Sequence, residues 1–266
     1  MKLVRELSAT AEAMRLNIIK LAGRAGAEGK GTHIAPSLSI VEIMAVLYNH
    51  IMQQNDVFVL SKGHGGLAYY AALMEAGVIT ESQLNAFETD GSDFPGQPSK
   101  NHGNGIVFSS GSLGMGLSYA SGLALAAKKS GERKKVYVLL GDGELNEGSN
   151  WESVMFARQH KLDNLIAIVD CNGMQSDGRT IDILDVDLES AFISYGWQTR
   201  VCNGHIVEDL AAAFEFPETE TPRIILAKTV KGKGVSFMEN NNTWHHNRLN
   251  SEQYKAALME VTNIGV

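Results

Sequence analysis

The stretch GDGELNEGSN (residues 141–150) decides the fold that we expect for this chain. It directly follows an apolar run, residues 136–140, which is typical of a parallel strand buried on both faces. Open α/β sheets bind their ligands where such strands end. The glycines and acids of this stretch therefore predict a ligand site at the carboxyl edge of a sheet.

A second strand is predicted one crossover further along the chain. The apolar run 165–169 ends close to Asn172, and residues 149–159 have helical character between the two runs. A right-handed crossover makes the two strands parallel, so their carboxyl ends line one crevice. We therefore expect Asp142 and Asn172 to lie side by side, next to a glycine loop whose backbone can approach a phosphate.

Composition limits the classes of protein to consider. The 266 residues, 44% apolar and 20% charged, can form one large core, and we expect a single domain over residues 1–266 because no linker, repeat or low-complexity tract divides them. A net charge of −7 argues against nucleic acid as a partner. No apolar stretch approaches the roughly 20 residues of a membrane span, and the N-terminus lacks a signal-peptide core. Cys171 and Cys202 form no disulfide framework, which fits a reducing cytoplasm.

Helices and strands are expected to alternate along the chain. The predicted helices span residues 8–25, 39–52, 67–75, 81–87, 117–129, 149–159, 188–194 and 206–214, and the further strands span residues 58–60, 198–202 and 223–228. THIAPS (residues 32–37) is expected to be a loop, and residues 89–105 an irregular segment. The alternation predicts a three-layer α/β fold, a mainly parallel sheet with helices on both faces.

The residues at the two strand ends favour a metal and a diphosphate. Asp142 offers an anionic oxygen, Asn172 a neutral one, and a backbone carbonyl just beyond Asn172 a third. Octahedral Mg²⁺ can complete its shell with phosphate oxygens and water. The alternative is a capped turn in which Asp142 only accepts hydrogen bonds from backbone N–H groups.

Other loops carry residues suited to the same ligand. GSLGMG (residues 111–116) opens a helix and either binds phosphate or packs closely, although its glycine order is not the dinucleotide fingerprint. Lys231, in KTVKGKGVSF (residues 228–237), either neutralises phosphate or is solvated. Histidines suited to proton transfer occur in several glycine-rich loops: His33, His64, His102, His245 and His246.

Together these segments resemble the thiamine diphosphate-binding half of transketolase. The resemblance covers nearly the whole chain and is carried, in the family's order, by THIAPSLSIVEIMAVLY, FVLSKGHG, GSLGMGLSYASG, GDGELNEGSNWE, KLDNLIAIVDCNG and KTVKGKGVSF, with Trp244 and His245 after them. It implies the thiamine diphosphate-binding fold. It also implies an enzyme in which the cofactor's thiazolium carbon carries a two-carbon ketol group from a ketose to an aldose.

The resemblance implies a role for each matching residue. Asp142, Asn172 and the carbonyl of Met174 match the ligands of the Mg²⁺ (or Ca²⁺) that anchors the diphosphate. The further cofactor contacts match His64, Gly111, Leu113, Gly143, Lys231 and His245. The residues near substrate match His33, for the sugar hydroxyls, and again His64 and His245. Glu147 matches an acid that lies in the subunit interface and links two cofactor sites.

Two departures from the family pattern have consequences. Single-chain transketolases are much longer, and the part absent here carries the glutamate that activates the aminopyrimidine. We therefore expect one subunit of a split transketolase, joined to a separate pyrimidine-side subunit in an α₂β₂ heterotetramer. Gln97 replaces a histidine of the family and cannot titrate, which favours a donor or acceptor outside the usual pentose phosphates, or a weaker contact to the donor's hydroxyls.

Three competing functions stay open at this point. The α subunit of a 2-oxo acid dehydrogenase component also carries a split cofactor domain with a GDG loop. A scaffold paralogue without catalytic activity would keep the fold alone. A nicotinamide-binding oxidoreductase is the weakest alternative because the glycine order is wrong.

Overall fold

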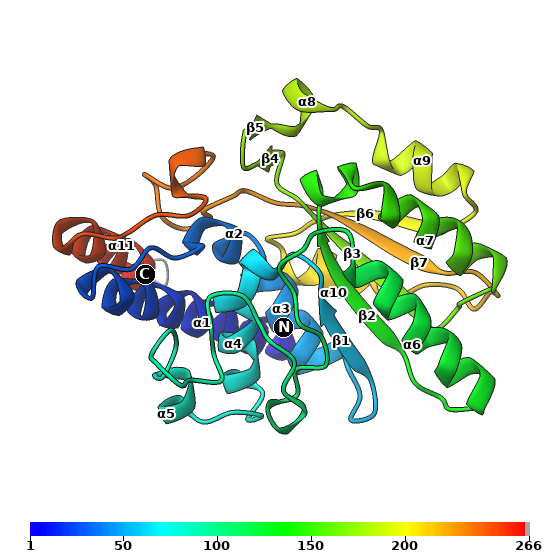
Figure 1. Ribbon diagram of the computed structural model, residues 1–266, viewed down its shortest axis with the longest axis horizontal. Helices are drawn as coiled ribbons and strands as arrows, with labels where there is room; N and C mark the ends of the chain where they lie inside the picture. Colours follow the sequence, from blue (N-terminus) through cyan, green and yellow to red (C-terminus); the bar gives the residue numbers. More distant parts are fainter. Residues whose placement is uncertain (264–266) are drawn as a thin grey trace.

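The computed structural model describes residues 1–263, and a five-stranded parallel sheet forms its centre, in the order β1-β2-β3-β7-β6 (Figure 1). Its strands are β1 (Val57–Leu60), β2 (Val136–Gly141), β3 (Leu165–Cys171), β6 (Gln198–Asn203) and β7 (Arg223–Lys228). All neighbouring strands pair in parallel, so their carboxyl ends lie at one edge of the sheet. A small antiparallel hairpin, β4 (Met174–Gln175) and β5 (Gly178–Arg179), follows β3.

Helices cover both faces of this sheet, which confirms the predicted three-layer α/β fold (Figure 1). The helices in the core on one face are α1 (Lys2–Ala27), α2 (Ile34–Leu38), α3 (Val41–Val46), α4 (Gly66–Glu75), α10 (Val207–Ala213) and α11 (Ser251–Asn263). Those on the other face are α6 (Gly116–Ser130), α7 (Gly148–Gln159) and α9 (Leu188–Ser194). The short elements are α5 (Glu81–Leu84), α8 (Thr180–Ile183) and the turns η1 (Leu47–Ile51), η2 (Gly63–Gly65), η3 (His102–Asn104), η4 (Gly143–Asn146) and η5 (Asn242–Trp244).

Side chains of the central strands alternate between the two cores. In β3, Ile166 and Ile168 point to the core on the α1 side, whereas Ala167 and Val169 point to the core on the α6 side. Because both faces are buried, the strand consists of one continuous apolar run. This burial explains why the sequence predicted the central strands well. None of the helices within residues 1–263 combines the length and apolarity of a membrane span.

Several predicted elements were wrong in extent. THIAPS is not a loop throughout, because α2 begins at Ile34; Pro36 lies in its first turn, where a missing N–H costs no hydrogen bond. The helix predicted over residues 39–52 is divided into α3 and the π turn η1. The helix predicted over residues 81–87 begins with a capping box at Thr80 but ends at Leu84. Helix α1 begins six residues before the predicted start at residue 8, and the hairpin, α8 and α11 were not predicted.

Candidate functional site

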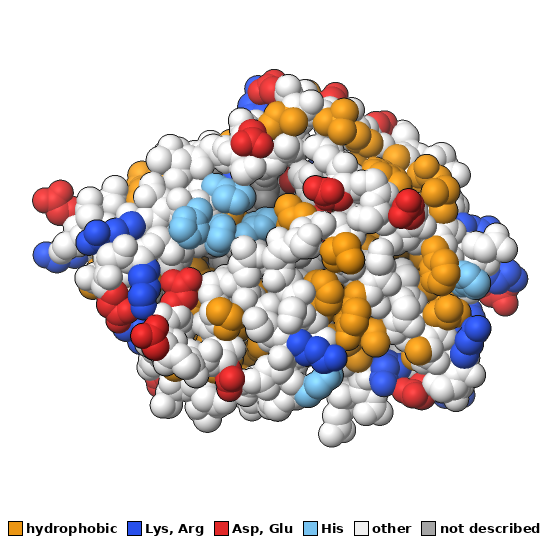
Figure 2. Space-filling model, viewed as in Figure 1, with side chains coloured by type: hydrophobic (Ala, Val, Ile, Leu, Met, Phe, Trp, Pro, Cys, Tyr) orange, Lys and Arg blue, Asp and Glu red, His pale blue; other side chains and the backbone are white. Residues whose placement is uncertain are grey.

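The candidate site lies at the carboxyl edge of the sheet, where four loops leave neighbouring strands. These loops are residues 61–64 after β1, 142–146 after β2, 172–174 after β3 and 229–233 after β7. Histidine side chains gather on this face of the molecule (Figure 2). Parallel pairing therefore brings together segments that are far apart in the sequence.

Asp142 and Asn172 lie on adjacent strand ends, as the sequence predicted. The carboxylate of Asp142 accepts hydrogen bonds from the N–H groups of Gly143 (2.8 Å) and Gly173 (2.6 Å), so the capped turn is also present. One bond to each oxygen leaves a lone pair on each for a cation. Burial, together with the negative charge of Asp170, raises the pKa of Asp142 to about 6. Such a carboxylate is stabilised in its charged form by a nearby cation.

Asp170 fixes the orientation of the Asn172 amide. Asn172 Nδ2 donates to Asp170 Oδ2 at 2.7 Å. An ionised carboxylate can only accept, so the nitrogen of the amide faces Asp170 and its oxygen points the other way. That oxygen accepts a hydrogen bond from the N–H of Met174 at 3.0 Å. Asn172 thus presents its oxygen away from the buried acid, as a metal ligand must.

The oxygen donors of this edge fit a magnesium ion. No three His, Cys, Asp or Glu side chains within residues 1–263 are grouped as a metal site. A metal here would be held by the Asp142 carboxylate, the Asn172 amide oxygen and a backbone carbonyl, with the rest of its shell supplied by phosphate and water. Mg²⁺ is bound in this way in many phosphate-dependent sites.

A buried ion pair between Lys62 and Asp170 supports the site, and the sequence motifs did not predict it. Both side chains are fully buried. Asp170 also accepts hydrogen bonds from Ser39 Oγ (2.7 Å) and Thr229 Oγ1, and Lys62 Nζ donates to the carbonyl of Pro36 (3.1 Å). Burial opposes the ionisation of Asp170, but Lys62 and the hydroxyl donors hold its pKa below the usual value. Asp170, an acid inside an otherwise apolar strand, is the sequence signal that could have predicted this ion pair.

Glu144 joins the glycine loop 111–116 to the strand ends, a role that was not predicted either. Its buried carboxylate accepts from Ser61 Oγ and from the N–H groups of Gly114 (3.0 Å) and Gly141 (3.1 Å). Burial raises the pKa of Glu144. A Cβ atom on Gly116 would lie only 2.3 Å from Ser61 Oγ, so close packing explains this glycine.

Three of the predicted histidines form one cluster. The ring centroids are 6.1 Å apart for His33 and His64, 5.6 Å for His33 and His245, and 5.3 Å for His64 and His245. The ring of His246 lies 4.5 Å from that of His33. Burial lowers the pKa of His33 to about 4 and that of His245 to about 3, and it holds the pKa of His64 well below its usual value. These rings are therefore neutral near pH 7.

His102 lies apart from this cluster. It is exposed in the turn η3. A histidine beside glycines therefore does not by itself indicate a residue of the functional site. Its loop must also lie at the carboxyl edge of the sheet.

Lys231 is buried, so the alternative of a solvated lysine does not apply. Its side chain is only 1% exposed, and Nζ donates to Asn242 Oδ1 (2.8 Å) and contacts His245 Nδ1 (2.9 Å). Burial lowers the pKa of Lys231 to about 8. Its ammonium therefore remains largely protonated near pH 7 and can attract an anion.

Gln97 reaches between two of the site's loops. A Cβ atom on Gly63 would lie 2.9 Å from Gln97 Oε1, and one on Gly111 would lie 3.0 Å from it.

Leu113 is half-buried in the glycine loop 111–116. Gly143 opens η4, and the exposed Glu147 precedes α7. The remaining predicted residues therefore also lie on loops at or next to this edge.

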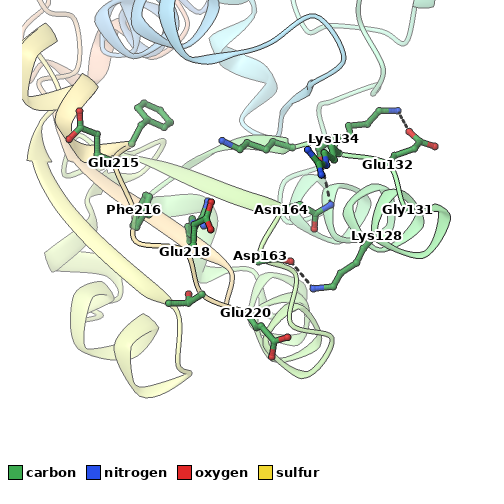
Figure 3. Close-up of a pocket in the computed structure, with 15 residues that line it drawn as sticks. Lys128, Gly131, Glu132, Lys134, Asp163, Asn164, Glu215, Phe216, Glu218 and Glu220 are labelled. Carbon is green, nitrogen blue, oxygen red and sulfur yellow. Dashed lines mark hydrogen bonds and ion pairs between the residues drawn. The ribbon is translucent and has the colours of Figure 1, made fainter.

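A cavity of about 1000 Å³ lies at the opposite, amino-terminal edge of the sheet (Figure 3). None of the residues predicted for the site lines it. Two ion pairs are formed among its charged side chains, Lys128 with Asp163 at 2.6 Å and Lys134 with Glu132 at 2.8 Å. We therefore place the functional site at the carboxyl edge.

Known proteins with similar sequences cover most of this chain. One subunit of the apulose-4-phosphate transketolase of Actinobacillus succinogenes is 40% identical, with 96% of each chain covered. A 6-deoxy-6-sulfo-D-fructose transketolase subunit of a Clostridium species is 38% identical, over 88% of this chain and 89% of that one. Human transketolase is 36% identical over 97% of this chain but only 42% of its own length.

A solved structure and a family profile agree with these relatives. The crystal structure of transketolase from Campylobacter jejuni superposes with a TM-score of 0.84 at 27% identity, covering 98% of this chain and 43% of that one. The family described as "Transketolase, thiamine diphosphate binding domain" matches residues 11–261. The chain therefore belongs to the transketolase family and carries that family's thiamine diphosphate-binding domain.

Proposed function

We propose that this chain is one subunit of a thiamine diphosphate-dependent transketolase that moves a two-carbon ketol group from a ketose to an aldose. The observation that carries the proposal is that Asp142 and Asn172 lie at adjacent strand ends, with the oxygen of Asn172 turned outward by Asp170. This arrangement occurs in a chain that matches transketolase subunits over almost its full length.

The cofactor's diphosphate is held, in this proposal, through Mg²⁺ or Ca²⁺ bound by Asp142, Asn172 Oδ1 and the carbonyl of Met174. The N–H of Gly143 and the ammonium of Lys231 bind the diphosphate directly. Gly111 and Leu113 contact the aminopyrimidine. Thiamine diphosphate supplies the carbon nucleophile that these side chains cannot provide.

The histidine cluster serves the sugar substrate. His33, His64 and His245 are neutral near pH 7 because burial lowers the pKa of each, so each has one nitrogen that donates and one that accepts. Neutral imidazoles can orient sugar hydroxyls and exchange protons with them. We assign His33 to the hydroxyls and His64 and His245 to the region nearest the reacting carbons.

A second subunit completes the enzyme in this proposal. More than half of the human transketolase chain has no counterpart here, whereas two relatives matched over 96% and 89% of their own length are named as subunits. Large apolar side chains remain exposed on the helices that follow β2 and β3, among them Phe156 on α7, Ile181 on α8 and Ile193 on α9, and apolar patches are visible on the face shown in Figure 2. Such a surface favours a protein partner.

We assign this surface to the pyrimidine-side subunit of an α₂β₂ heterotetramer. Glu147, exposed at the start of α7, then faces the interface between subunits. Within this assembly the present chain acts as a single domain. The unpaired Cys171 and Cys202 support a cytoplasmic location.

We propose that the donor or the acceptor lies outside the usual pentose phosphates, or that the contact to the donor's hydroxyls is weaker. Gln97 stands where the family pattern has a histidine, and its carboxamide lies between the loops of Gly63 and Gly111. A carboxamide can hydrogen-bond a hydroxyl but cannot exchange a proton with it. The relatives named for apulose 4-phosphate and for a sulfonated fructose suggest which donors to test first.

Reconstitution with the partner tests the proposal. The isolated chain, the isolated pyrimidine-side subunit, and their mixture are each assayed for ketol transfer with thiamine diphosphate and Mg²⁺, using apulose 4-phosphate, 6-deoxy-6-sulfofructose and xylulose 5-phosphate as donors. Activity is expected only in the mixture. Full activity of the chain alone contradicts the split assembly, and oxidation of pyruvate with an artificial electron acceptor favours a 2-oxo acid dehydrogenase. Absence of cofactor binding in the mixture favours a scaffold.

A further inference from the structure

The loop that carries Lys231, residues 229–233, is hydrogen-bonded to a buried network of polar and charged side chains, which we call the relay. It consists of Arg15 on α1, Glu42 on α3 and His205 between β6 and α10. Arg15 Nη2 forms an ion pair with Glu42 Oε1, and His205 Nδ1 lies 3.0 Å from Glu42 Oε2. Arg15 is 5% exposed and Glu42 8% exposed. The relay is therefore a buried network at the end of the core on the α1 side.

The relay ends on two backbone groups that flank Lys231. His205 Nε2 accepts a hydrogen bond from the N–H of Val230 at 2.8 Å. Arg15 Nε donates to the carbonyl of Lys233 at 3.1 Å. A third contact, from the N–H of Gly232 to the carbonyl of Ala35 at 3.0 Å, ties the same loop to α2.

The hydrogen bonds of His205 determine its tautomer. A backbone N–H can only donate, so Nε2 must offer a lone pair to Val230 and the ring proton resides on Nδ1. Nδ1–H then donates to Glu42, whose other oxygen is occupied by Arg15. Burial opposes the ionisation of Glu42, but the bond from His205 and the charge of Arg15 hold its pKa below the usual value. Each member therefore depends on the next for its charge or orientation.

A buried ion pair alone is a poor source of stability. Replacement of such a pair by apolar side chains is often neutral or stabilising, because removing two charges from water costs free energy. The specific contribution of this relay is to the position of the loop, because its two ends hydrogen-bond the backbone on either side of Lys231. A cavity of about 660 Å³ borders His205, Val230 and Lys233, so the loop has space to move if the relay is broken.

We infer that the relay of Arg15, Glu42 and His205 is a positioning unit that holds the Lys231 ammonium in place for the anionic part of the cofactor. This inference rests on the cofactor role proposed for Lys231. In this conformation of the loop, Lys231 reaches Asn242 and His245. None of the relay residues touches the cofactor in this account.

Variants of His205 in the assembled enzyme test the inference. His205→Leu removes both hydrogen bonds, whereas the carboxamide of His205→Gln can donate to Glu42 and accept from Val230. His50→Leu, on an exposed histidine of the neighbouring turn η1, is the control. Two properties are measured: the affinity for thiamine diphosphate by calorimetry, and the pH dependence of Lys231 amidination in the cofactor-free enzyme by mass spectrometry.

His205→Leu is expected to weaken cofactor affinity about tenfold, the lower end of the effect of supporting residues around a metal or ligand site. It is also expected to move the midpoint of Lys231 amidination from about 8 toward the ordinary lysine value of 10.5, because a released side chain becomes solvated. His205→Gln should restore both properties, and His50→Leu should change neither. If His205→Leu does not fold, Glu42→Gln, which removes the central charge, carries the same test.

An unchanged amidination profile in a folded His205→Leu or Glu42→Gln enzyme overturns the inference. A merely structural role would lower the unfolding temperature without moving this profile. Lys231→Met separates the inference from the proposed function. If this variant binds the cofactor as tightly as the wild type, the role proposed for Lys231 is wrong, and the amidination profile alone decides whether the relay positions its loop.

Discussion

The two edges of the sheet differ in how they hold charge. At the carboxyl edge, Lys62 and Asp170 are fully buried and are bonded to several loops at once. At the amino-terminal edge, the larger cavity is lined by ion pairs such as Lys128 and Asp163, whose side chains are 37% and 42% exposed. Buried charge destabilises a fold unless it is fully paired, whereas exposed pairs contribute little. Buried charged side chains that are hydrogen-bonded to several loops therefore identify the functional edge here better than cavity size does.

The largest expected difference between the two edges concerns their lysines. Lys62→Met leaves Asp170 buried without its counter-ion, which should cost about 3–5 kcal/mol of unfolding free energy. Lys128→Met at the other edge removes an exposed pair and should cost no more than about 1 kcal/mol. Urea denaturation of both variants measures the difference. Equal costs would show that the Lys62–Asp170 pair is not the structural centre of the carboxyl edge.

A smaller effect is expected at Gln97. Gln97→His should raise the activity on xylulose 5-phosphate about two- to tenfold, the value of about one hydrogen bond, because the imidazole can also exchange a proton with the donor's hydroxyl. His102→Gln is the matched control, since His102 is exposed in η3 and should have no effect. Steady-state kinetics with the reconstituted enzyme provide the measurement. Unchanged kinetic constants for Gln97→His, or a large loss of activity for His102→Gln, would show that the assignment of the donor contact to Gln97 is wrong.

The smallest effect, counted per pH unit, is a dependence of stability on pH. His33 has a folded-state pKa of about 4, lowered by burial from 6.5, so between these values the unfolded chain binds more protons than the folded one. Stability is therefore fully present above pH 6.5 and falls as the pH decreases toward 4, by less than about 1 kcal/mol per pH unit. Thermal unfolding of His33→Asn should show a shallower loss in acid. His160→Asn, on an exposed histidine after α7, should keep the slope of the wild type, and identical slopes for all three proteins would contradict burial as the cause.

The sequence predicted those parts of the site that depend on strand order. Apolar runs buried on both faces identified the strands, and parallel pairing then required Asp142 and Asn172 to be neighbours. The supporting contacts could not be predicted in this way. Lys62 and Asp170 are 108 residues apart, and Glu42 and His205 are 163 residues apart, so no local pattern encodes either pair.

Short elements escaped prediction for a different reason. The hairpin strands β4 and β5 have two residues each, too few for any periodicity to appear. Helix α2 begins inside a segment that contains a proline, which favours a loop on sequence grounds, although a first helical turn tolerates proline. In each case the surrounding tertiary structure determined the local conformation.

Cofactor binding by a matched pair of aspartate variants tests the central claim most directly. Calorimetry of thiamine diphosphate binding to the assembled enzyme, with and without Mg²⁺, is compared for the wild type, Asp142→Asn at the carboxyl edge and Asp163→Asn at the amino-terminal edge. We predict affinity about 100-fold weaker and no longer Mg²⁺-dependent for Asp142→Asn, and no change for Asp163→Asn. Wild-type, Mg²⁺-dependent binding by Asp142→Asn would contradict the account.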